Sequence, residues 1–139
     1  MIRLIVPGEP CGKQRARTFF DRRVGHVVSK TPDKTKNYET LIRELFAVKY
    51  AGFVPLAVPV RLRLNIYRGI PKSESMTRAE KMEATLIRPI TKPDSSNVLK
   101  AVEDALNGLA FRDDSQIVEI IAQKYYSRAP RVEITVEEI

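Results

Sequence analysis

Apolar and polar residues alternate along residues 58–67, which read VPVRLRLNIY. The apolar positions of this stretch include Val60, Leu62, Leu64 and Ile66. Arg61, Arg63 and Asn65 occupy the positions between them. A period of two places these two sets on opposite faces of a β-strand. The stretch therefore predicts a strand with one face on a core and the other, basic face in water.

Three further segments have the composition of strands. Residues 2–6 form a short apolar run that stops at a proline and a glycine. Residues 116–126 and 131–136 form two more runs, separated by an alanine and a proline at 129–130. Proline and small residues between apolar runs are typical of a turn, so these segments predict one N-terminal and two C-terminal strands.

A small hairpin is predicted near the N-terminus. Its strands would be formed by Phe19 and Phe20 and by residues 24–28, with Gly25 at the bend. The loop that leads into it reads PGEPCGKQRARTF and carries three cations between two apolar segments. These cations are Lys13, Arg15 and Arg17.

Helical periodicity marks two long segments and one short one. In residues 31–50 apolar side chains recur every three or four positions, as they do in residues 92–108, which end in the stop signal Asn107-Gly108. Residues 73–87 are polar and predict a short helix outside the core. The order of elements predicts an α/β chain of the α+β type, a mixed β-sheet with two main helices packed on one face, in one domain over residues 1–139.

The composition favours one class of partner and argues against several kinds of site. The 24 lysines and arginines against 17 acids give a formal charge of +7, which favours an anionic partner such as nucleic acid, although a solvated basic surface gives the same sum. A single cysteine, Cys11, and a single histidine, His26, argue against a disulfide, a zinc site or a Ser-His-Asp triad. No apolar run approaches the ~20 residues that cross a bilayer, so we expect a cytoplasmic protein without a membrane partner.

The predicted helix at residues 92–108 has a polar edge formed by Asp94, Asn97, Lys100 and Asp104. One interpretation is an ordinary amphipathic helix, with Asp94 or Ser95 as N-cap and an ion pair between Lys100 and Asp104 four residues apart. The adjacent carboxylates of Asp113 and Asp114 favour a second interpretation, because like charges side by side repel unless solvent or a cation lies between them. Two to four aspartates in a basic surround suit Mg²⁺-assisted hydrolysis of a phosphodiester, provided that the fold brings the carboxylates together.

Three motifs in order resemble the RusA-type Holliday-junction resolvases, which are often borne by phages or prophages. They are K-P-D-x-x-N-x-x-K-A at residues 92–101, D-A-L-N-G at 104–108 and D-D-S-Q-I-V at 113–118, and the loop at 7–17 is similar to the opening loop of that family. The resemblance implies a small homodimer that uses Mg²⁺, or Mn²⁺ in its place, to make paired nicks across a four-way DNA junction.

The resemblance also implies roles for individual residues. Its catalytic residues fall on Asp94, Lys100 and Asp114. Metal binding is expected from Asp94, Asp114 and Asp113, and Asp104 matches a further acidic position of the family. DNA contacts are expected from the loop cations and the helix edge, namely Lys13, Arg15, Arg17, Asn97 and Lys100.

One family position departs from the pattern, because Ser96 stands where the family has a second aspartate in the first motif. A hydroxyl is a weaker ligand for a hard cation than a carboxylate, so the site would bind metal less tightly or recruit Asp113 or Asp104.

Two other functions stay open. One is a protein that binds branched DNA without cutting it. The other is a phosphoesterase acting on small molecules, which fits the charge of +7 less well. The expected place of the five phenylalanines is the core or an interface, although a phenylalanine wedged into a junction centre is a known kind of DNA contact. They are Phe19, Phe20, Phe46, Phe53 and Phe111.

Overall fold

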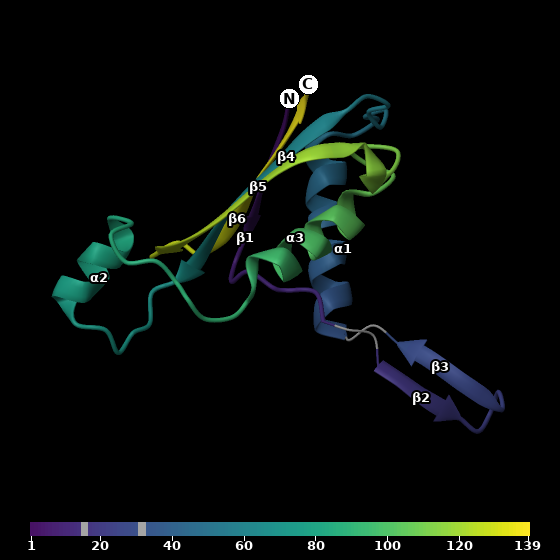
Figure 1. The fold of residues 1–139 in the computed structure, drawn as a ribbon, viewed down its shortest axis with the longest axis horizontal. Helices are drawn as coiled ribbons and strands as arrows, with labels where there is room; N and C mark the ends of the chain where they lie inside the picture. The colour runs from purple at the N-terminus through teal and green to yellow at the C-terminus, as the bar shows by residue number, and fades with distance from the viewer. Residues whose placement is uncertain (15–16, 31–32) are drawn as a thin grey trace.

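The computed structural model describes residues 1–14, 17–30 and 33–139. In chain order its elements are β1 (Ile2–Pro7), β2 (Arg17–Asp21), β3 (His26–Lys30), α1 (Asp33–Lys49), β4 (Val60–Gly69), α2 (Met76–Glu83), α3 (Ser95–Leu106), the 3₁₀ turn η1 (Asp114–Gln116), β5 (Ile117–Ser127) and β6 (Arg131–Glu138). Figure 1 shows their arrangement around one twisted sheet.

Four strands form a mixed sheet in the order β1, β6, β4, β5. β6 pairs antiparallel with both β1 and β4, whereas β4 and β5 pair in parallel. The two C-terminal strands are therefore not a hairpin, because β4 lies between them. The parallel pair needs a long crossover, and residues 70–116, which contain α2 and α3, supply it.

The alternation of apolar and polar residues in β4 buries one face of the strand, as predicted. Its four alternate apolar side chains are buried, and none is more than 1% exposed: Val60, Leu62, Leu64 and Ile66. On the opposite face, Arg61 pairs with Glu119 of β5 at 2.5 Å and with Glu137 of β6 at 3.0 Å. The outer basic face is thus partly neutralised by carboxylates from the neighbouring strands.

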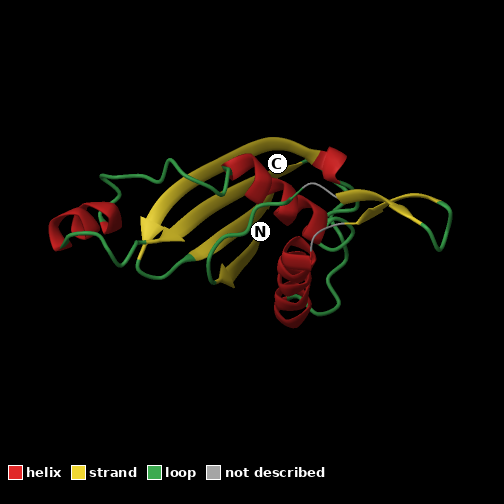
Figure 2. Ribbon diagram, turned by 90° about the horizontal axis from the view of Figure 1, so that it is seen from below, coloured by secondary structure: helices red, strands yellow, loops and turns green. Residues whose placement is uncertain are grey.

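The helices α1 and α3 lie on one side of the curved sheet, as predicted (Figure 2). Each buries one apolar stripe against the sheet, and the buried side chains are Tyr38, Ile42 and Phe46 of α1 and Val98, Ala101, Val102, Ala105 and Leu106 of α3. Arg43 of α1 also donates from Nε to the carbonyl oxygen of Ala105, at 3.2 Å. The predicted α+β architecture is confirmed, and α3 is held against both the sheet and α1.

The ends of several elements differ from the sequence prediction. α3 begins at Ser95 rather than at residue 92, because Pro93 biases the residue before it away from helical geometry and Asp94 takes the N-cap position. The expected first residues of α1, Thr31 and Pro32, lie outside the described residues. Gln116 belongs to η1 and not to a strand.

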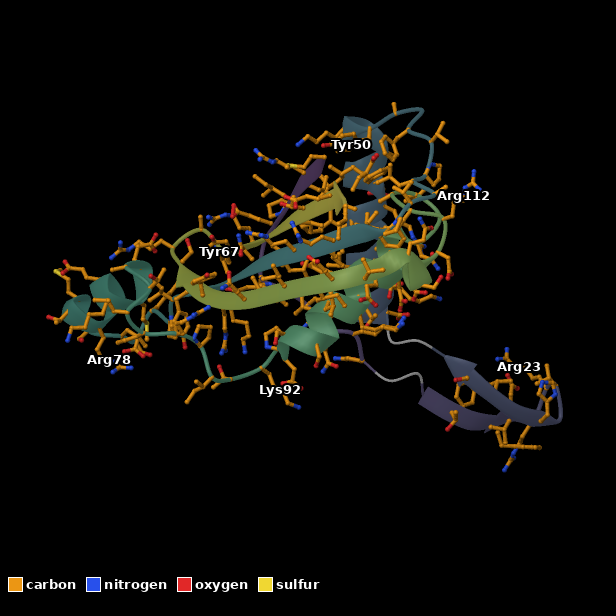
Figure 3. The ribbon with its side chains drawn as sticks, turned by 45° about the horizontal axis from the view of Figure 1, so that its top comes forward. Arg23, Tyr50, Tyr67, Arg78, Lys92 and Arg112 are labelled. Carbon is orange, nitrogen blue, oxygen red and sulfur yellow. The ribbon has the colours of Figure 1, made fainter. Side chains whose placement is uncertain are left out.

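Two elements project from opposite ends of the body (Figures 1 and 3). The first is the predicted hairpin of β2 and β3, which ends in a turn that contains Arg23. The second is α2, capped at its start by the Ser75 hydroxyl, which accepts from the Arg78 backbone N–H at 3.3 Å. Across residues 1–14, 17–30 and 33–139, no helix is both long and apolar enough to cross a membrane.

Candidate functional site

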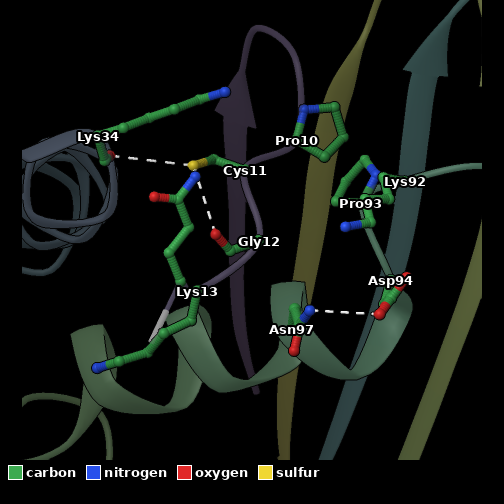
Figure 4. A pocket seen from close by; sticks show the side chains of 10 residues that line it. Pro10, Cys11, Gly12, Lys13, Lys34, Lys92, Pro93, Asp94 and Asn97 are labelled. Carbon is green, nitrogen blue, oxygen red and sulfur yellow. Dashed lines mark hydrogen bonds between the residues drawn. The ribbon is translucent and has the colours of Figure 1, made fainter. Parts of the chain in front are cut away.

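A pocket forms where the loop after β1 crosses the first turn of α3. It has a volume of about 640 Å³. Figure 4 shows its walls, which come from the loop, from the start of α1 and from the start of α3. The lining residues are Pro10, Cys11, Gly12, Lys13, Gln14, Lys34, Lys92, Pro93, Asp94 and Asn97. Lys34, Lys92 and the N-terminus of α3 around one pocket make it a suitable place for an anionic group.

Gly12 allows the loop to approach α3 this closely. The Lys13 backbone N–H donates to the carbonyl oxygen of Asn97 at 2.9 Å. A Cβ atom placed on Gly12 would lie 3.0 Å from the Cβ of Asn97 and 3.3 Å from the Cβ of Pro93. Since such contacts are tighter than nearly all real Cβ contacts, a side chain at position 12 would push the loop away from the helix.

The Lys13 side chain turns inward and joins three elements. Its Nζ lies 3.1 Å from Glu39 of α1 and 2.5 Å from Asp104 of α3. The hydrogen bond to Asp104 raises the pKa of Lys13 despite its partial burial. Partial burial alone would raise the pKa of Asp104, but hydrogen bonds from Lys13 and Lys100 hold it below its ordinary value of 3.8. The sequence predicted a DNA contact for Lys13, and the structure gives its ammonium two internal carboxylate partners.

The Lys13 ion pairs predict a pH-dependent stability. Asp104 stabilises the fold above pH 3.8, and this contribution is lost as pH falls through its lowered folded pKa. Lys13 stabilises it below pH 10.5, and this is lost as pH rises through its raised pKa. Lys13→Gln should therefore reduce the free energy of unfolding at pH 7 by about 1 to 2 kcal/mol and flatten its change at both extremes.

Urea unfolding followed at a series of pH values would check this. The control is Lys36→Gln, which removes an exposed lysine of α1 and should leave the pH profile unchanged. A Lys13→Gln profile that superimposes on the wild-type profile would contradict the structural role of the ion pairs.

Lys100 connects α3 to the segment that follows it. Its Nζ lies 3.3 Å from Asp104 and 3.9 Å from Asp114, the first residue of η1. The side chains of Lys100 and Asp114 are 52% and 39% exposed, so both can reach a ligand in solvent. The ion pair of Lys100 and Asp104 expected for a simple amphipathic helix is present, and the contact with Asp114 adds a second carboxylate to it.

Asp113 has a different surrounding from Asp114, although the two are adjacent. Its carboxylate accepts from the backbone N–H of Ser115 at 3.2 Å and from the Ser115 hydroxyl. Gln116 in turn accepts from the Asp113 backbone N–H at 2.9 Å, which completes a capping box for η1. The hydrogen bonds from Ser115 lower the pKa of Asp113. Asp113 thus shapes the turn, and Asp114 faces Lys100.

Asp94 and Asn97 lie at the start of α3, beside the pocket. Asp94 is the N-cap residue, but its side chain makes no capping hydrogen bond. Its Oδ2 lies 3.4 Å from Nδ2 of Asn97. Ser96 is exposed one residue before Asn97. The Asp94 carboxylate is therefore available to a ligand at the positive end of the helix.

The aspartates expected to hold a metal come from two segments, Asp94 at the N-cap of α3 and Asp114 at the start of η1. Among the described residues, no group of three or more histidine, cysteine, aspartate or glutamate side chains is arranged to hold a metal ion. Asp94 and Lys100 are six residues apart, which corresponds to a rise of roughly 9 Å along a helix. Asp94 and Asp114 are nevertheless exposed or partly exposed carboxylates, the donors that Mg²⁺ takes singly or in pairs while keeping waters and phosphate oxygens. The donor chemistry fits Mg²⁺, and the metal-ligand assignment stays a prediction.

Other residues of the site were missed or cannot be placed. Lys34 and Lys92 line the pocket, and Lys92 could have been found because it opens the K-P-D motif. Glu103 was also missed: burial raises its pKa, the nearby Lys100 lowers it, and Asp114 and Asp104 raise it further. Arg15 lies outside the described residues, and Arg17 is described only by its place in β2.

Comparison with known proteins gives two matches. A family model described as endodeoxyribonuclease RusA matches residues 7–137, which include the pocket loop, α3 and η1. The chain is also 39% identical over 140 residues to the uncharacterized protein YqaN of Bacillus subtilis (strain 168), a match that covers 99% of this chain and 96% of that protein. The family model spans nearly the whole chain and confirms the resemblance carried by the three motifs. The chain therefore belongs to the RusA endodeoxyribonuclease family.

Proposed function

We propose that the protein is a metal-dependent endodeoxyribonuclease that resolves Holliday junctions by paired symmetric nicks. The observation that carries this proposal is the contact between Lys100 and Asp114, which places a cation and an accessible carboxylate together in a family of DNA endonucleases. The neighbouring pocket adds lysines that suit a phosphate. DNA as substrate also agrees with the net charge of +7, and it suggests that the protein works in the cytoplasm.

In this proposal each part of the site has a separate task. Lys34 and Lys92 attract a backbone phosphate to the pocket, and the positive end of α3 helps to hold it. Lys100 offsets the negative charge that develops on the phosphoryl oxygens during hydrolysis. Asp94 and Asp114 would hold Mg²⁺ or Mn²⁺, which when bound lowers the pKa of an attacking water and polarises the phosphate. Lys13 keeps the loop on α3, so its contribution to DNA binding is indirect.

We also propose that the protein works as a homodimer. A four-way junction has approximate two-fold symmetry, and two symmetric nicks need two sites related in the same way. Contacts to the phosphate backbone carry little sequence information, so a two-fold arrangement of sites provides selectivity for the shape of the junction. Light scattering at micromolar concentration should give twice the chain mass of 15.8 kDa.

The direct test is incubation of the protein with a labelled synthetic four-way junction or with linear duplex of the same sequence. We expect symmetric nicks in the junction with Mg²⁺ or Mn²⁺, no nicks with a chelator, and little cutting of the duplex. Cleavage of a nitrophenyl phosphodiester without preference for junctions would instead favour a small-molecule phosphoesterase.

Ser96→Asp is expected to speed up metal-dependent nicking by about tenfold or more and to lower the Mg²⁺ concentration needed. Position 96 is exposed in the first turn of α3, where the helix dipole favours a carboxylate and where a second acid would lie near Asp94. The measurement is the single-turnover nicking rate at several Mg²⁺ concentrations, with Ser96→Ala as the control that should stay near the wild-type rate.

The Ser96→Asp variant also distinguishes a nuclease from a protein that only binds the junction. Ser96 stands where the family has an aspartate that binds the metal. This favours a second candidate function, in which the protein binds branched DNA without cutting it. If wild type and Ser96→Asp both bind the junction tightly and neither makes nicks, this second function replaces the first.

A further inference from the structure

The hairpin of β2 and β3 is an extended ribbon that projects from the body of the protein. Its five residue pairs run from Arg17 opposite Lys30 to Asp21 opposite His26. Within the described part of the chain, neither strand packs extensively on a helix or on the four-stranded sheet. A two-stranded ribbon on its own is only marginally stable in water, so this element is suited to a partner outside the chain.

Both faces of the hairpin expose apolar side chains. Phe20 and Val27 are directly opposite on one face and are 61% and 64% exposed. Phe19 on the other face is 46% exposed. The sequence led us to expect both phenylalanines in the core or in an interface, and the core is excluded by these values. Exposed apolar pairs on a projecting element are typical of a contact surface.

The charge of the hairpin favours a polyanion as that partner. Residues 17–30 contain four arginines and lysines and one acid, a net charge of +3 with His26 neutral, out of +7 for all 139 residues. Arg22 and Arg23 lie in the exposed turn, and the Arg23 side chain is 91% exposed. A second copy of this chain also carries +7, so long-range electrostatics favours DNA over self-association at this element.

The position of the hairpin relates it to the candidate site. The loop that lines the pocket, residues 10–14, leads along the chain toward β2, and Figure 1 shows the hairpin pointing away from the end of the body where this loop meets α1 and α3. A DNA strand with a phosphate in the pocket would therefore continue into a duplex arm within reach of the ribbon. Figure 3 shows Arg23 at the tip of the hairpin, far from Arg78 on α2.

We propose that this hairpin lies in the major groove of a junction arm and holds that arm beside the scissile phosphate. The proposal rests on the function proposed above. The major groove of B-DNA, about 12 Å wide, admits a two-stranded β-ribbon, whereas the minor groove is about half as wide. Arg22 and Arg23 contact the phosphates that border the groove, and Phe20 and Val27 contact base edges such as thymine methyl groups.

Two double variants test the two kinds of contact. Arg22→Gln with Arg23→Gln removes the cations of the turn, and Phe20→Thr with Val27→Thr removes the apolar pair but keeps residues that favour strands. The matched control is Arg3→Gln with Arg63→Gln, which removes the same charge from exposed positions on the sheet face opposite the helices. Since the hairpin does not pack on the core, all three variants should unfold at the wild-type urea concentration.

The measurements are junction affinity at several salt concentrations, protection of guanine N7 from methylation in the arms, and mass in solution. We expect the arginine variant to reduce the slope of log affinity against log salt by about 2, because each neutralised phosphate contributes about 0.9. Both hairpin variants should lose protection of guanine N7, an atom of the major groove, while the control keeps it and all masses stay equal.

Three other outcomes of these measurements would each contradict a different proposal. Wild-type affinity, salt slope and protection in both hairpin variants would overturn the hairpin proposal and leave the nuclease proposal intact. A halved mass of the hairpin variants would assign the hairpin to the contact between two copies of the chain. Absence of any junction binding by the wild type would overturn the proposed function itself.

Discussion

Asp114→Asn is expected to slow metal-dependent nicking of a four-way junction by about 100-fold or more, with junction affinity changed by no more than a few fold. The Asp114 carboxylate lies 3.9 Å from Nζ of Lys100, and its side chain is partly exposed. Replacing a metal-binding carboxylate by an amide removes a charge that holds the cation, and a loss of about 3 kcal/mol in the transition state corresponds to roughly 100-fold in rate. Single-turnover nicking at saturating junction, together with anisotropy for binding, measures both quantities.

The neighbouring aspartate provides the matched control. Asp113→Asn removes the same charge one residue earlier, but the Asp113 carboxylate caps its own turn through Ser115. We expect this variant to keep most of the nicking rate and to change the stability little, because asparagine is about as good an N-cap residue as aspartate. Equal losses of rate in the two variants, or an unchanged rate in Asp114→Asn, would contradict the assignment of Asp114.

Phe111→Ala is expected to reduce the free energy of unfolding by about 3 to 5 kcal/mol, the range for a fully buried phenylalanine. The Phe111 side chain is 0% exposed and belongs to the core. Its backbone carbonyl accepts from the Gly108 N–H at 2.8 Å. The adjacent Arg112 N–H donates to the carbonyl of Leu56 at 3.1 Å. Loss of the ring should therefore loosen the connection that places Asp114 after α3.

Urea denaturation followed by circular dichroism measures this effect. Phe111→Leu keeps most of the apolar volume and should cost much less than the alanine variant. A cost below about 1 kcal/mol for alanine would mean that the surrounding residues collapse into the space without loss.

Local patterns were enough to predict most elements. The alternation of β4 and the helical stripe of α3 each specify which face is buried, and both predictions are confirmed because these patterns act over neighbouring residues. The strand order β1, β6, β4, β5 was not predicted, since the partners of β4 come from the C-terminal part of the chain. Nothing in the local sequence shows that β6 inserts between β1 and β4.

The contacts of the candidate site were likewise predictable only where the two residues are close in the sequence. The contact of Lys100 with Asp104 was predictable, because four residues on a helix span one turn. The contact of Lys13 with Asp104 joins residues 91 positions apart and depends on how the loop crosses α3, which no spacing in the sequence reports. For the same reason the spacing of Asp94 and Asp114 in the sequence could not show how the fold places one relative to the other.

The parallel pairing of β4 with β5 has a consequence for how the protein folds. These strands are paired across a crossover of residues 70–116, so their contacts have a large sequence separation and form slowly compared with local helical contacts. The crossover contains α3, and η1, which begins at Asp114, directly precedes β5. A chain still emerging from the ribosome can form the α3 helix before β5 exists, but it cannot yet place Asp114 beside Lys100. We therefore expect nuclease activity to arise only after β5 and β6, residues 117–138, have been added to the chain.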